Sequence, residues 1–245
     1  DRFFSIISHD LRTPLATLDS FLNILLNFSD RMKPEQMQKL ANHTQVSVRN
    51  LQALLENLLQ WAASQTDSDH AMRFEPETLK LDDLVQRNII LLQDTADTKQ
   101  LQWQVHVPED LQVMADANMF DFIIRNLVHN AIKFSNAGGI IKLTARATPN
   151  RFAEITVEDN GVGMAADVVK SLFHAEQPAI TTKGTANEKG TGLGLLLCRS
   201  FAERCGGSIT AKSEEDKGSC FWVTVPLVPT KHSHDPEREL EEEIC

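Results

Sequence analysis

The sequence predicts an α+β chain in two parts, an antiparallel helical hairpin over residues 1–66 and a mixed helix-and-strand domain over residues 76–228. Apolar residues recur every three or four positions in the first part, which is the periodicity of a helix. The second part contains alternating strand-like segments between turns with glycine. A polar, aperiodic stretch from residue 65 to 75 separates the two, and we place a linker at residues 67–75.

Composition and charge exclude several classes of protein. The formal net charge of −10 argues against nucleic acid as a partner, and half of that charge lies after residue 234, in an acidic tail or linker over residues 229–245. The four cysteines have no C-x-x-C spacing, so neither a disulfide framework nor a zinc site is indicated, and a reducing cytoplasmic location fits best. No apolar run of about 18 residues is present, so we expect no direct membrane contact. The chain begins inside an apparent helix, which suggests a piece of a longer protein.

The first helix is organised around a histidine. Its apolar stripe consists of Ile7, Leu11, Leu15, Leu18, Leu22 and Leu25. At about 100° per residue, His9 falls opposite this stripe and should face solvent. Asp10 follows it directly, and Thr13 shares its face one turn on. Pro14 should bend the helix here, although a helix that starts at Pro14 with Thr13 as its cap is the alternative.

A second helix follows a break at residues 29–34. Its seam, with steps of four and three, is Leu40, Thr44, Ser47, Leu51, Leu54, Leu58 and Trp61. Two such helices form a hairpin with more apolar surface than one partner can cover, so we expect a homodimer with a four-helix bundle. A plain coiled-coil spacer is the alternative, but it leaves the exposed His9 without a use.

The second part opens with a predicted helix over residues 79–98, strands over 101–107 and 111–115, and a helix over 117–135. In the last of these, Asn126, Asn130 and Lys133 lie at i, i+4 and i+7 on one face. An amide oxygen suits Mg²⁺ and a lysine suits phosphate, whereas two asparagines inside a helix have poor propensity. The pattern fits a solvated helix surface and a binding site equally well.

The next segments hold two glycine motifs. Strands over residues 139–148 and 151–158 lead to Asp159-Asn160-Gly161-Val162-Gly163, in which an ionised aspartate suits an amino group such as that of adenine. Such a turn is weak evidence alone. After a short helix that closes at Leu172 and Phe173, residues 174–189 resemble a mobile lid. A second glycine run then opens an apolar helix, which makes an anion site, and a hairpin over 208–212 and 220–225 ends the domain.

Together these motifs resemble the catalytic core of a sensor histidine kinase up to about residue 226. The segment from His9 to Leu15 resembles the phosphoacceptor box, Asn126 to Ser135 the N box, and Leu172-Phe173 a reduced F box. The two glycine boxes correspond to Asp159-x-Gly161-x-Gly163 and to Gly190-Thr191-Gly192-Leu193-Gly194.

The resemblance implies an ATP-binding α/β sandwich of the gyrase, Hsp90 and MutL type behind a dimeric hairpin. It implies Asn130 as the Mg²⁺ ligand, with Asn126 and Lys133 near the phosphates. It places Phe134 against the nucleoside, where the family often has tyrosine, and Asp159 on the adenine amino group. The glycine boxes would complete the nucleotide site.

The implied activity is that of an ATP-dependent autokinase in a two-component system. His9 would attack the γ-phosphorus, Asp10 would hold or deprotonate its far ring nitrogen, and phosphohistidine would donate to an aspartate of a response-regulator receiver domain. Thr13 resembles the residue that positions water for a phosphatase reaction on the regulator. The alternatives are an ATPase clamp of the same fold and a non-catalytic dimeric scaffold. The chain would then be the cytoplasmic portion of a longer, membrane-anchored sensor.

Overall fold

The fold is taken from a computed structural model. It describes residues 2–28, 32–42, 44–45, 47–48, 51, 55, 74–173, 183–186, 188, 192 and 194–228, with side chains from residue 15 onward.

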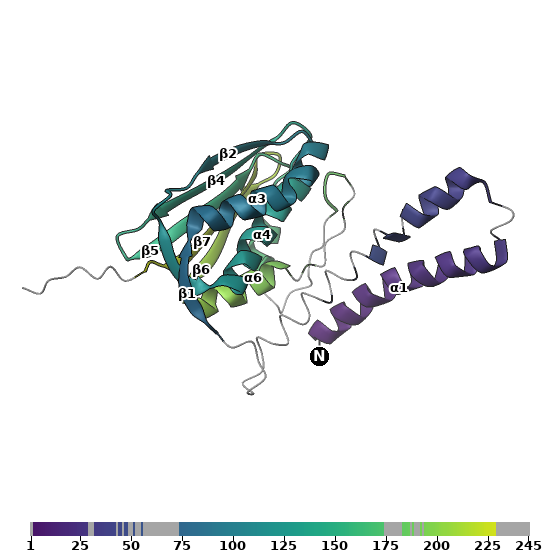
Figure 1. The fold of residues 1–245 in the computed structure, drawn as a ribbon, viewed down its shortest axis with the longest axis horizontal. Coiled ribbons are helices and arrows are strands. Elements are labelled where there is room, and N and C mark those ends of the chain that lie inside the picture. The colour runs from purple at the N-terminus through teal and green to yellow at the C-terminus, as the bar shows by residue number, and fades with distance from the viewer. Residues whose placement is uncertain are drawn as a thin grey trace, which may run out of the picture.

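The N-terminal part is helical. Helix α1 (Arg2–Phe28) runs through Pro14 without interruption, so the alternative of a helix that starts at Pro14 is wrong. A second helical segment begins at residue 34, and its described residues up to 55 are helical (Figure 1). Four apolar side chains of α1 are at least 47% exposed in the single chain, namely Leu15, Leu22, Leu26 and Phe28. Leu54, Leu58 and Trp61 of the predicted seam lie outside the described residues.

The second part contains a sheet in the order β2-β4-β5-β7-β6. Its strands are β2 (Gln102–His106), β4 (Ile140–Ala147), β5 (Phe152–Asp159), β6 (Ser208–Glu214) and β7 (Gly218–Pro226). The β2–β4 pair is parallel and the other pairs are antiparallel. Buried and less buried residues alternate along β4 and β5, so one face of the sheet is packed against the core.

A second sheet has two strands, and the sequence predicted only the later one, over residues 111–115. Strand β1 (Pro76–Lys80) pairs antiparallel with β3 (Gln112–Asp116), and the following helix α3 (Leu81–Thr98) therefore begins at Leu81 rather than at residue 79. All residues of β1 except Leu79 are exposed, so this strand lacks the alternation of apolar residues that would reveal it. Its pairing with β3, more than 30 residues away, is what makes it a strand.

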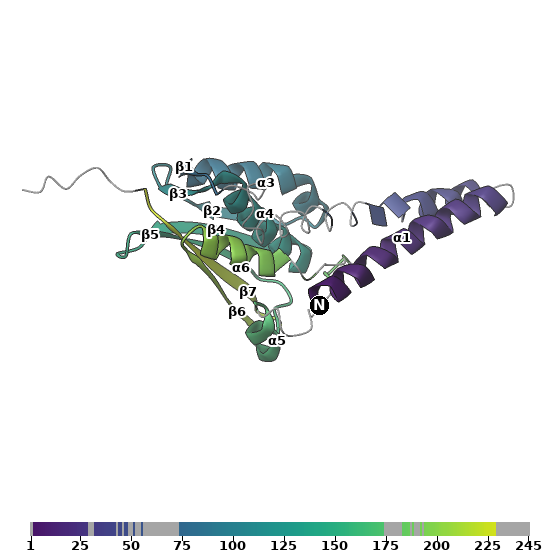
Figure 2. The ribbon, with the colours of Figure 1, turned by 90° about the horizontal axis from the view of Figure 1, so that it is seen from below.

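Three helices cover one face of the larger sheet. Figure 2 shows α3, α4 (Ala117–Phe134) and α6 (Gly194–Arg204) on the same side of it, while the short α5 (Ala166–Ser171) lies near one end. The core combines these helices with the inward residues of the strands, and Phe120, Ile124, Leu127, Ile155 and Phe201 are at most 1% exposed. The rings of Phe122 and Phe201 meet edge to face at 5.3 Å, which joins α4 to α6. The predicted α+β architecture is confirmed.

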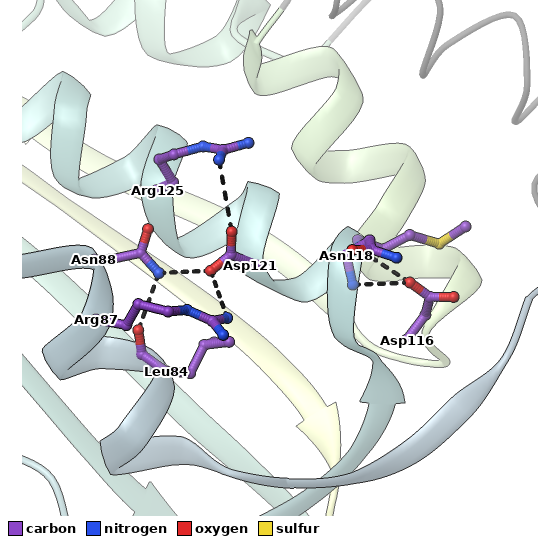
Figure 3. Close-up of polar contacts among 8 residues, drawn as sticks. Leu84, Arg87, Asn88, Asp116, Asn118, Asp121 and Arg125 are labelled. Carbon is purple, nitrogen blue, oxygen red and sulfur yellow. Dashed lines mark hydrogen bonds and ion pairs between the residues drawn. The ribbon is translucent and has the colours of Figure 1, made fainter. Parts of the chain in front are cut away.

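Polar contacts fix α4 at its N-terminal end and against α3 (Figure 3). The carboxylate of Asp116 accepts hydrogen bonds from the backbone N–H groups of Asn118 and Met119, at 3.0 and 3.1 Å, and thereby caps the helix. Asp121 Oδ1 accepts from Asn88 Nδ2 and from Arg87 Nη2 of α3, both at 2.9 Å. These contacts set the rotation of α4, and hence the direction in which its asparagines point.

Among the described residues, no helix combines the length and the apolar character needed to cross a membrane.

Candidate nucleotide site

The predicted polar face of α4 exists. Asn130 Nδ2 donates a hydrogen bond to Asn126 Oδ1 at 3.1 Å, which orders both amides along the helix. Because the nitrogen of Asn130 is used in this bond, its Oδ1 is the atom that can face a cation, and an amide oxygen is a ligand that Mg²⁺ accepts. Lys133, one turn further on, is only 5% exposed, and its ammonium lies 4.6 Å from the centroid of the Phe134 ring. Burial lowers the pKa of Lys133 from its ordinary value.

Asp159 closes strand β5 and is 5% exposed. Burial raises its pKa to about 6, against the opposing effect of the backbone N–H groups of Gly161 and Ser219. Gly161 N donates to Asp159 Oδ1 at 2.9 Å, which fixes the carboxylate in one orientation. At neutral pH the group is mostly ionised and therefore accepts hydrogen bonds only, as an exocyclic amino group requires.

The turn after Asp159 packs directly on the end of α4. Val162 N donates to the Phe134 carbonyl oxygen at 3.1 Å. A Cβ at Gly161 would overlap that same oxygen, so only glycine allows the approach. Gly163 has a φ of +65°, and a Cβ there would overlap the carbonyl oxygen of Glu214. Both glycines thus allow close approach of two segments of the protein's own backbone, and their approach to a nucleotide stays a prediction.

The first residue of α6 lies against the other end of the polar face. A Cβ at Gly194 would lie 2.8 Å from Asn126 Oδ1, so the absence of a side chain lets the helix start reach the asparagines. The N–H groups at a helix N-terminus attract anions. Gly192 is exposed, with a φ of +69°, whereas Gly190, Thr191 and Leu193 of the second glycine box lie outside the described residues.

Helix α4 therefore separates two different chemical environments. Midway along the helix, Asn126 meets the N-terminus of α6, and at the C-terminal end Phe134 meets the Asp159 turn. Eight residues at 1.5 Å each place these two positions about 12 Å apart.

The residues predicted for phosphoryl transfer lie on α1. His9, Asp10 and Thr13 fall within this helix, but their side chains belong to residues 2–14, whose side chains are outside the described part. Their assignment stays a prediction.

Four residues of this region were not predicted. Lys99, Thr185 and Glu188 form a polar cluster at the C-terminal end of α4. Arg199 of α6 donates from Nη1 to the Phe173 carbonyl oxygen at 3.0 Å, which ties the reduced F box to α6. A lysine one residue after a helix is ordinarily solvated, and its partner here lies 86 residues away, so no local pattern could have revealed it.

Two family models match the chain. The model described as histidine kinase-, DNA gyrase B- and HSP90-like ATPase matches residues 115–229. The model described as the His Kinase A (phospho-acceptor) domain matches residues 1–66.

Individual proteins agree with these matches. The adaptive-response sensory kinase SasA of Prochlorococcus marinus subsp. pastoris is 29% identical over 230 residues, which cover 93% of this chain and 58% of SasA. The histidine kinase AdeS of Acinetobacter baumannii superposes with a TM-score of 0.69 at 20% identity, covering 89% of this chain and 98% of that one. A structure of histidine kinase ThkA in complex with the response regulator TrrA gives 0.70 at 19% identity, covering 95% and 63%. At such identities the two superpositions establish the fold alone.

Proposed function

Since the chain belongs to the sensor histidine kinases, of which it carries both the phospho-acceptor and the ATPase domain, we propose that it is an ATP-dependent autokinase that phosphorylates His9. We further propose that phosphohistidine passes its phosphoryl group to an aspartate of a response-regulator receiver domain. The chain spans little more than half the length of SasA, so the proposal concerns the catalytic core.

The observation that carries this proposal is the arrangement along α4. An anion-attracting helix start at Asn126 and a buried acceptor carboxylate beside Phe134 lie about 12 Å apart. A nucleoside triphosphate needs a hydrogen-bond acceptor for its adenine amino group and donors or cations for its phosphates. Residues along this helix and beside it supply both. The adenine amino group would donate to Asp159, and the phosphates would lie toward Asn126, Lys133 and the start of α6.

The chain's own residues have separate tasks in the reaction. Asn130 would hold the magnesium ion through its amide oxygen, and this ion supplies charge neutralisation of the triphosphate. Lys133 adds a cation, and the N–H groups of α6 orient the phosphates. The turn at Gly161 and Gly163 would shape the adenine end of the site.

Transfer itself requires a neutral imidazole. A free imidazole, with a pKa of about 6.5, is largely uncharged at neutral pH, so that one ring nitrogen of such a group can attack the γ-phosphorus. A nitrogen–phosphorus bond forms while the bond to the β–γ bridging oxygen breaks, and ADP leaves with the electron pair. Asp10 takes or holds the proton of the far ring nitrogen.

We propose two binding partners for the helical hairpin, a second copy of the chain and a receiver domain. The exposed leucines of α1 would be covered by a second copy, in a four-helix bundle. The ThkA structure contains a response regulator beside the kinase, and we propose a receiver domain as the partner of this chain too. Thr13, predicted on the same face as His9, would position water for a phosphatase reaction on that partner.

Incubation with γ-labelled ATP tests the kinase. The wild type should acquire label that is stable to alkali and labile to acid, and His9→Gln should acquire none while still binding nucleotide. His106→Gln, which changes an exposed histidine on β2, is the matched control and should label normally.

The other functions predict different results. An ATPase clamp would hydrolyse ATP without retaining label. A non-catalytic scaffold would bind no Mg-ATP, and Asn130→Ala would leave its function unchanged. Absence of label in a wild type that binds Mg-ATP would reject the autokinase.

A further inference from the structure

Lys99 is a buried lysine just beyond the end of α3, with 9% of its surface exposed. A buried ammonium is costly unless each of its protons finds an acceptor. Four oxygen atoms surround its Nζ within 2.9 Å, so its three protons are shared among them. The surrounding oxygen atoms stabilise the charge of Lys99, and the segments to which they belong indicate its role.

The four acceptors come from two separate parts of the chain. The carbonyl oxygens of Ile132 and Lys133, in the last turn of α4, each lie 2.9 Å from Nζ. Thr185 Oγ1 and Glu188 Oε1 lie at 2.7 Å. One ammonium thus joins the negative end of the α4 dipole to a segment more than 50 residues further along the chain.

That segment, defined here as the docked segment (residues 183–186 and 188), makes further contacts with α4. Thr185 N donates to the Lys133 carbonyl oxygen at 3.1 Å, and Thr185 Oγ1 donates to the Ser135 carbonyl oxygen at 2.7 Å. A Cβ at Gly184 would lie 2.6 Å from Lys133 Cγ, so the chain passes directly over the side chain of Lys133. The docked segment therefore packs on the cation proposed to face the phosphates.

The ion pair between Lys99 and Glu188 also holds the docked segment at the end of α4. Although partial burial acts to raise it, the pKa of Glu188 is lowered overall by the hydrogen bonds from Lys99 and from the backbone of Ala186. Its Oε2 accepts from Ala186 N at 2.8 Å while Oε1 pairs with Lys99, so both oxygens are engaged. The Lys99–Glu188 pair is mostly shielded, with side chains 10% and 32% exposed, and is therefore stronger than a surface ion pair.

We propose that Lys99 is a positioning residue for nucleotide binding, because it fastens the docked segment to the end of α4 that carries Lys133. Only residues 189–193 separate Glu188 from Gly194, the start of α6. Lys99 therefore anchors the chain at Glu188, six positions before the anion-attracting helix start. The inference rests on the proposed nucleotide site.

The test compares Lys99→Met, Lys99→Arg, Glu188→Gln and the Met/Gln double variant in the full chain with Mg²⁺ and a fluorescent ADP analogue. Lys99→Met should release the nucleotide about tenfold faster, as expected for loss of a charged hydrogen bond. Glu188→Gln should act in the same direction, the double variant should be no worse than Lys99→Met, and Lys99→Arg should restore most of the affinity.

A second measurement does not depend on nucleotide. At a temperature well below the thermal midpoint of both proteins, trypsin should cut after the exposed Lys183 faster in Lys99→Met than in the wild type. Lys217→Met, which removes an exposed ion pair with Glu214, is the control and should leave both measurements unchanged.

Different results would overturn different statements. If Lys99→Met lowers the thermal midpoint but leaves nucleotide release and cleavage at Lys183 unchanged, Lys99 only caps α4 and the inference is wrong. Additive effects of Lys99→Met and Glu188→Gln would also reject it, since the two would not share a contact. A wild type that binds no nucleotide, yet shows the difference in cleavage, would reject the nucleotide site and leave the attachment standing.

Discussion

Asp159→Asn should change how the stability of the domain depends on pH. The pKa of this buried carboxyl is raised from 3.8 to about 6 on folding. Between these values the folded chain holds more protons than the unfolded chain, so the free energy of unfolding falls as pH rises through this window. A shift of roughly two units corresponds to about 3 kcal/mol. The wild type should therefore lose about 2.5 kcal/mol of stability from this group between pH 4 and pH 8, since part of the effect lies below pH 4.

The asparagine variant should lack this contribution, because its amide does not ionise. Urea unfolding of both proteins at pH 4 and pH 8 measures it, and the other titrating groups cancel in the difference. Between pH 4 and pH 8 the stability of the variant should rise by about 2.5 kcal/mol relative to that of the wild type, and its ADP affinity should be at least about tenfold lower. If the stability difference between the two proteins is the same at both pH values, the carboxyl is not desolvated as described. Unchanged ADP affinity at pH 8 would separately reject its role in adenine binding.

Gly161→Ala and Asp116→Ala test the two ends of α4, and Gly207→Ala is the control for the first. Gly161→Ala should weaken nucleotide binding at least about tenfold and lower the thermal midpoint, because its Cβ overlaps the Phe134 carbonyl oxygen. A Cβ at Gly207 would overlap the backbone in a similar way, but away from the site. In calorimetry Gly207→Ala should therefore lower the thermal midpoint by a comparable amount and leave nucleotide affinity unchanged. An equal loss of nucleotide affinity in both variants would contradict the site assignment. Asp116→Ala removes the cap of α4 and should cost about 1–2 kcal/mol in urea unfolding, and a change below about 0.3 kcal/mol would show that the cap is not needed.

The polar face of α4 was predictable because it depends on local spacing. Asn126, Asn130 and Lys133 share a face in any helix, whatever surrounds it. The apolar residues beside them fixed the helix boundaries to within one residue, and the helix ends at Phe134. The turn at Gly161 and Gly163 was weak evidence alone, and only its order among the other motifs indicated its place in a site.

Features that depend on distant pairing could not be predicted in this way. Strand β1 is short and mostly exposed, and only its register with β3 defines it. Lys99 resembles a solvated lysine at a helix end, and nothing near it in the sequence indicates the two carbonyls and the carboxylate that surround it. The cost of burying an ammonium reveals the site only once the fold has brought these acceptors together.

Helix α4 also explains how the separate motifs would act as one site in the proposed function. Its N-terminal cap, Asp116, is also the acceptor for Glu75 N at 3.2 Å, so the helix is fixed where the domain begins. Its rotation is set by Asp121 against α3, and its far end is held by Lys99 and by the turn after Asp159. Because each of these contacts fixes the helix at a different point, the two asparagines and Lys133 have little freedom to move. A rigid helix with both ends fixed can hold adenine and phosphates at a constant separation, and this leaves any movement during transfer to the segments attached to it.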